Sequence, residues 1–155
     1  MFYISNYINK ISIALLIASV RLNNTLQEDW VCYPDGPSQW SHCAMTPLIM
    51  MHQGIAGIKP ITAGYKTFQI YPQLADLNAV DITTNTVAGP VVFKARGLLG
   101  SRKLSLEIPA GTTAELIVDK RERLGLKKAG VSKIPGKITY IIKGGTKVTI
   151  ALKYT

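Results

Sequence analysis

The sequence predicts a mainly β protein in which an antiparallel β-sandwich follows one or two helices. From residue 60 onward, apolar and polar residues alternate at a spacing of two, which is typical of half-buried strands. Short turns rich in Gly and Pro separate these runs at regular intervals. Before residue 60, apolar residues recur at helical spacing instead. Seven or eight short strands with such turns indicate a sandwich of two sheets.

Each predicted strand is defined by alternating apolar residues. The runs are Phe68 and Ile70; Val80 and Ile82; Val91 and Phe93; Leu104, Leu106 and Ile108; Leu116 and Val118; Ile138, Tyr140 and Ile142; and Val148, Ile150 and Leu152. Turns are expected at Gly89-Pro90, Gly100-Ser101, Ala110-Gly111, Pro135-Gly136 and Gly144-Gly145. The residues expected to face the core are Phe68, Ile70, Leu106, Ile108, Leu116 and Val118.

Residues 41–56 are predicted to form one helix that packs on the sandwich and has a buried middle. Ser41 is a suitable N-cap, and Pro47 falls in the first turn, where proline is tolerated. Gly57 suits the helix C-terminus. The outer face of this helix is apolar, so the chain is expected to self-associate or to need a partner. The side chains expected in this sticky patch are Met50, Met51 and Ile55.

The first 22 residues form an apolar segment that is unassigned and expected to be helical. Its core, residues 11–20, is too short to span a bilayer, which takes about 20 residues. It fits either a buried helix or the core of a signal peptide. No stable membrane span is therefore expected. Cys32 and Cys43 are compatible with a disulfide and with free thiols, and two cysteines alone suggest no metal site.

The chain of 155 residues carries a formal net charge of +9, and 47% of its residues are hydrophobic. This composition excludes a chain that is disordered throughout. The basic residues cluster in 120–123 and at Lys127-Lys128. Such a cluster is either a solvated face or a surface for an acidic polymer. No aromatic residues interleave with it, so nucleic-acid binding is not expected.

Candidate catalytic residues gather between positions 28 and 42. Glu28 and Asp35 are the one isolated pair of acids before the sandwich, and glycoside hydrolysis uses two carboxyl groups that flank the scissile bond. Trp30 and Trp40 supply aromatic faces that stack on sugars, although both also suit a core. His42 fits either a sugar contact or a helix entrance. No motif for a cofactor is present.

Several segments together resemble bacterial α-L-rhamnosidases of glycoside hydrolase family 78. They are TLQEDW (25–30), Ser41-His42, PITAGYKTFQIYP (60–72) and LSLEIPAGTTAELI (104–117). The resemblance covers residues 25 to about 118. It implies that residues 23–59 are the C-terminal piece of an (α/α)6 catalytic barrel and that residues 60–155 are the C-terminal β-sandwich.

The resemblance also implies roles for the candidate residues. The family carries a Thr-x-x-Glu-x-Trp segment whose glutamate is the general base, which makes Glu28 the base and places Trp30 in the sugar pocket. His42 then contacts the substrate, and Trp40 and Asp35 are expected beside it. The chain is accordingly expected to be the C-terminal portion of an enzyme that hydrolyses terminal α-L-rhamnosyl residues with inversion.

The family's general acid lies far upstream of its general base, and no acidic residue precedes Glu28 here. The chain is therefore expected to be a fragment that is inactive alone; the alternative is a non-catalytic carbohydrate-binding or structural sandwich. The expected partners are a rhamnose-containing glycoside or polysaccharide, the missing part of the barrel, or a second copy. Location in a bacterium, whether cytoplasmic, periplasmic or secreted, stays open, as do linkage and aglycone specificity.

Overall fold

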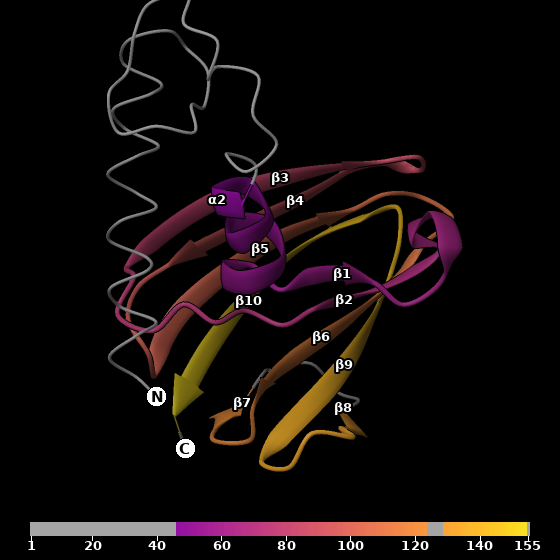
Figure 1. Ribbon diagram of the computed structural model, residues 1–155. Helices are drawn as coiled ribbons and strands as arrows, with labels where there is room; N and C mark the ends of the chain where they lie inside the picture. Colours follow the sequence, from indigo (N-terminus) through magenta and orange to yellow (C-terminus); the bar gives the residue numbers. More distant parts are fainter. Residues whose placement is uncertain (1–45, 124–128, 155) are drawn as a thin grey trace, which may run out of the picture. The chain divides into compact units, whose positions relative to one another are not determined.

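A computed structural model describes residues 46–123 and 129–154 (Figure 1). The chain divides into two compact units, Met1–Met50 and Met51–Thr155. The described part of the first unit is α2, Thr46–Ile49, together with Met50. The second unit contains every strand of the described residues, and the account below concerns that unit unless stated otherwise.

The predicted helix is present in its described part, but its middle is not buried. α2 is followed directly by η3, a π-helix over Met50–Ile55. Ile49 and Met50 are 53% and 39% exposed. Met51 and Ile55 are half-buried and pack against the sandwich core, so they do not belong to an exposed apolar face. The prediction of a buried middle is therefore wrong, because only one side of this short helix meets the core.

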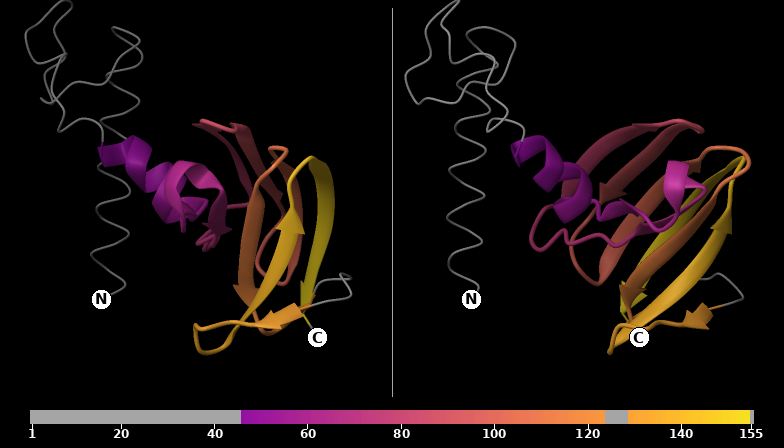
Figure 2. Two further views of the ribbon diagram at one scale, coloured as in Figure 1. Left: turned by 90° about the vertical axis from the view of Figure 1, so that its right-hand side faces the viewer. Right: turned by 45° about the vertical axis from the view of Figure 1, so that its right-hand side comes forward.

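The predicted mainly β sandwich is confirmed, with five strands in each of two layers (Figures 1 and 2). The first sheet, sheet A, contains, in spatial order, β1 (Ile58–Pro60), β2 (Thr67–Ile70), β6 (Thr113–Asp119), β9 (Lys137–Lys143) and β8 (Ala129–Val131). The second, sheet B, contains β3 (Ala79–Thr86), β4 (Gly89–Arg96), β5 (Ser101–Ile108), β10 (Thr146–Tyr154) and β7 (Glu122–Arg123). The short 3-10 helix η4 (Ala63–Tyr65) lies in the exposed loop between β1 and β2.

All strand pairs are antiparallel except one. β2 runs parallel to β6, and Phe68 lies opposite Ala114. Between these two strands the chain changes sheet twice, once after β2 and once between β5 and β6. The predicted Pro-Ala-Gly turn at the second crossing is therefore not a hairpin. Thr112 stabilises it, since its Oγ1 donates to the Pro109 carbonyl at 2.7 Å.

The core lies between the two sheets and contains all six residues expected there. Phe68, Ile70, Leu106 and Leu116 are fully buried, and Ile108 and Val118 are 4% exposed. Each of the seven alternating runs forms a strand. Three further strands were not expected, because β1, β7 and β8 are only two or three residues long and show no clear alternation.

Sheet A begins at Ile58, which is fully buried, while the following Lys59 is exposed. The assignment of residues 23–59 to a catalytic barrel stays a prediction. Among the helices within residues 46–123 and 129–154, none has the length and apolar character needed to cross a bilayer.

Candidate functional site

The predicted catalytic and substrate-binding residues lie outside the described residues. This applies to Glu28, Trp30, Asp35, Trp40 and His42, and also to Cys32, Cys43 and the apolar segment 11–20. Their predicted roles therefore stay predictions. The described residues nevertheless contain a polar cluster at one end of sheet A, and its geometry determines what this part of the chain can do.

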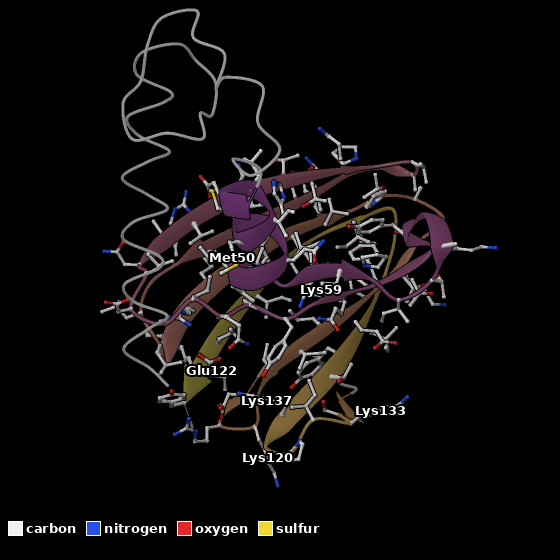
Figure 3. All side chains as sticks on the ribbon, in the orientation of Figure 1. Met50, Lys59, Lys120, Glu122, Lys133 and Lys137 are labelled. Carbon is white, nitrogen blue, oxygen red and sulfur yellow. The ribbon has the colours of Figure 1, made fainter. Side chains whose placement is uncertain are left out.

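Two turns meet at that end of the sandwich (Figure 3). β6 ends at Asp119 and leads into Lys120 and Arg121, while the loop before β9 closes over residues 134–137. The Lys120 backbone N–H donates to the Gly136 carbonyl at 2.9 Å, which holds the two turns together. Lys137 opens β9.

Pro135 and Gly136 explain why the second turn forms. The Lys137 N–H donates to the Ile134 carbonyl at 3.2 Å, which closes a four-residue turn. Gly136 has φ of 75°. Pro at the second position and a positive-φ Gly at the third are the residues that a type II turn requires. The turn predicted from this pair is therefore confirmed, and it places Lys137 beside Asp119 at the end of β6.

Asp119 is the centre of the polar cluster. Its Oδ1 accepts from the Arg121 backbone N–H and from Arg121 Nε, each at 2.9 Å, and its Oδ2 accepts from Lys137 Nζ at 3.2 Å. The hydrogen bond from the Arg121 side chain is the largest cause that holds the pKa of Asp119 well below its usual value. Asp119 is therefore an anion that organises two neighbouring cations.

Two tyrosines flank the Asp119 cluster. Lys137 Nζ lies 5.9 Å from the centroid of the Tyr71 ring, and Arg121 Cζ lies 5.3 Å from that of Tyr154. Tyr71 follows β2 in sheet A, whereas Tyr154 ends β10 in sheet B. Because a cation covers one face of each ring, these contacts tie the ends of both sheets together.

Three other described carboxylates have partners of their own. Asp81 forms a bidentate pair with Arg96, both contacts at 2.7 Å, and the hydrogen bond from Arg96 lowers its pKa. Glu107 pairs with Lys147 at 2.9 Å. Glu122 is buried and accepts from the Gly100 N–H at 3.4 Å. In residues 46–123 and 129–154, no group of three His, Cys, Asp or Glu side chains is placed to hold a metal ion.

His52 has a structural contact. Its Nδ1 lies 2.7 Å from Thr84 Oγ1, which joins η3 to β3. The His52 side chain is half-buried and is not part of the closed core. This contact holds η3 against the sandwich.

Comparison with known proteins identifies the sandwich. Residues 57–133 match the sequence model of the bacterial alpha-L-rhamnosidase C-terminal domain. The chain carries an alpha-L-rhamnosidase C-terminal domain. The matched residues begin one position before β1 and extend past β8, so they include most of both sheets. β9 and β10 follow the matched residues and complete the two sheets of this rhamnosidase C-terminal domain.

Solved structures with a similar fold are also alpha-L-rhamnosidases. The Streptomyces avermitilis enzyme, solved in complex with L-rhamnose, is 21% identical with a TM-score of 0.58, and the match covers 75% of this chain and 11% of that one. The Dictyoglumus thermophilum enzyme is 17% identical with a TM-score of 0.61, and the match covers 84% and 16%. The chain thus spans a small part of the length of both enzymes. A search of curated proteins found no match.

The sequence did not reveal how the cationic residues gather. The basic run at 120–123 was visible, but Lys137 joins it only because the Pro135-Gly136 turn lies against the end of β6. The Pro135-Gly136 pair was the signal in the sequence that a turn forms here. Its position beside β6 depends on the pairing of β6 with β9, which alternation alone does not define.

Proposed function

We propose that this rhamnosidase C-terminal domain is the non-catalytic sandwich of an enzyme that hydrolyses terminal α-L-rhamnosyl residues with inversion. The match of residues 57–133 to the family is the observation that carries the proposal. The Streptomyces avermitilis enzyme was solved with L-rhamnose, which supports a rhamnose-containing glycoside or polysaccharide as substrate. Because the chain matches only 11% and 16% of the two solved enzymes, the activity is proposed for a larger catalytic assembly.

The proposed catalytic roles come from the resemblance of the N-terminal segments. Glu28 is the general base that activates water, and Trp30, Asp35, Trp40 and His42 contact the sugar. Inverting hydrolysis also needs a second carboxyl group about 6.5 to 9.5 Å away that protonates the leaving oxygen. This acid must stay protonated near neutral pH, so its pKa must be raised.

Two of the described carboxylates do not suit that second role. Arginine hydrogen bonds lower the pKa of Asp81 and of Asp119, so both are deprotonated near neutral pH. We therefore propose that the chain alone does not turn over rhamnosides.

The test uses an aryl α-L-rhamnoside and the purified full chain. Wild type, Glu28→Gln and the control Glu115→Gln are assayed beside a complete α-L-rhamnosidase, and release of the phenol is followed by absorbance. All three forms of the chain should match the enzyme-free blank. Turnover by wild type and Glu115→Gln that disappears in Glu28→Gln would contradict the proposal, since it would require a second acid within these residues or in a self-assembled form.

A non-catalytic carbohydrate-binding role is the second candidate function. The cluster of cations around Asp119 favours it, because this is a charged, solvent-facing surface on a domain that resembles part of a glycosidase.

A further inference from the structure

We propose that the cationic end of the sandwich binds polysaccharides that carry carboxylate groups. The cationic end consists of Lys120, Arg121, Lys133 and Lys137, and Figure 3 labels its three lysines. Asp119 lies between Arg121 and Lys137. This proposal specifies the ligand of the carbohydrate-binding role. It rests on the proposed function, because that function is the reason for choosing a glycan as the ligand.

The charges at this end do not cancel. The cationic end has four cations and one carboxylate, Asp119, which is already shared by Arg121 and Lys137. Lys120 and Lys133 are exposed, and neither belongs to the ion pairs found within the described residues. Glu122, the nearest acid in sequence, is 5% exposed and turns toward Gly100. The cationic end is therefore complementary to a polymer with repeated negative charges.

The backbone positions these cations before any ligand arrives. The hydrogen bond between Lys120 and Gly136 joins the two turns, and Asp119 accepts from the Arg121 backbone. Lys137 lies between Asp119 and the Tyr71 ring, and its side chain is 25% exposed. Because the anchoring residues are already ordered, binding costs less conformational entropy than it would on a mobile basic tail.

The aromatic contacts favour a sugar acid over a nucleic acid. Proteins that bind single strands stack bases on open aromatic faces within a basic groove. Here Tyr71 and Tyr154 each have one face covered by a cation. Carboxylates of a polysaccharide need only the ammonium and guanidinium groups. Linked to a catalytic barrel, such a surface would raise the local concentration of polymeric substrate.

The experiment measures binding of the full chain to polygalacturonate by isothermal titration calorimetry at low salt. The fully methyl-esterified polymer serves as the ligand control, because it keeps the sugar chain and removes the charge. The test variant is Lys120→Gln/Lys133→Gln. The matched control is Lys94→Gln/Lys103→Gln, which removes two exposed lysines from β4 and β5 of sheet B and changes the net charge equally.

Wild type should bind polygalacturonate and not its methyl ester, and affinity should fall as salt screens the charges. The test variant should bind about tenfold more weakly, on the order expected for two lost ionic contacts. The control variant should change affinity less than twofold. Circular dichroism should show the same folded spectrum for all three proteins.

Three outcomes would overturn the proposal. They are equal binding of the esterified polymer, equal weakening by both double variants, and tighter binding of single-stranded DNA or of phosphatidylserine vesicles that depends on Lys120 and Lys133. The wild-type comparison of the two polymers does not depend on how the variants fold. Since hydrolysis is not measured, this test can fail while the proposed rhamnosidase role stands, and the reverse also holds.

Discussion

Leu106 shows how strongly one side chain can contribute to this fold. It lies on β5 between Phe93 of β4 and Val148 of β10 and is fully buried. Truncation to alanine removes buried methyl groups and leaves a cavity, so Leu106→Ala should lower the free energy of unfolding by about 2 to 5 kcal/mol. Urea denaturation followed by circular dichroism measures this change.

The control for that prediction is Val87→Ala in the turn between β3 and β4. Val87 is 88% exposed, so its truncation should change stability by less than about 0.5 kcal/mol. If both variants lost the same stability, the assignment of the core to the space between the sheets would be wrong.

Asp119 should make stability depend on pH in the acid range. Its pKa is lower in the folded chain than the ordinary value of about 3.9, so the folded state favours the deprotonated form. The stabilisation is therefore complete above about pH 4 and is lost as pH falls toward the folded-state pKa. Asp119→Asn should cost about 1 kcal/mol at pH 7, and less as pH falls below about 4.

Thermal unfolding of wild type and Asp119→Asn measures this effect. The pH is varied from about 2 to about 7, so that it passes through the ordinary pKa of aspartate. Asp76→Asn is a suitable control, because Asp76 is exposed and belongs to none of the ion pairs in the described residues. A destabilisation by Asp119→Asn that stayed constant from neutral to acid pH would contradict a role for the carboxylate charge.

At the scale of elements, Gly57 is the residue that lets η3 lead into β1. It has φ of 67°, and a Cβ at this position would overlap the Tyr71 carbonyl. The Tyr71 N–H donates to the Gly57 carbonyl at 3.1 Å, so the two backbones cannot separate without losing this bond. Gly57→Ala should therefore destabilise the domain by about 3 kcal/mol.

Gly111 allows the effect of a positive φ to be separated from the effect of close packing. It also has a positive φ, of 76°, but a Cβ there would meet nothing within 4 Å. Gly111→Ala should cost only about 1 kcal/mol from backbone strain. Differential scanning calorimetry of both variants measures the two losses of stability. Equal losses would show that close packing at Gly57 is unimportant.

The sequence contained enough information for the long strands but not for their pairing. Alternation located Phe68, Leu106 and Ile150 in strands because a half-buried strand leaves that pattern. β7 and β8 left none, since each has two or three residues. Which strand joins which sheet depends on contacts between distant residues, and so does the contact of Lys120 with Gly136 at the cationic end.

At the scale of the whole molecule, a shared core makes the two sheets of the second unit interdependent. Phe68 and Leu116 of sheet A pack in the same buried cluster as Phe93 and Leu104 of sheet B. Neither sheet can bury its apolar face alone, because that face is covered by the opposite sheet. The sandwich should therefore unfold as one cooperative unit. The predicted catalytic residues at 28–42 lie outside the described residues.

The parallel pairing of β2 with β6 sets the order in which the domain can assemble in time. β3, β4 and β5 pair with their immediate neighbours in sequence, so this meander closes short loops and can form early. β2 must wait until Thr113–Leu116 have left the ribosome. In pulse-labelled refolding, amide protons of β3–β5 should become protected before those of β2, and simultaneous protection would contradict this order. The newly made β1–β2 hairpin thus passes through a period in which the edge of β2 that later pairs with β6 is open, and a chaperone or another chain can reach it.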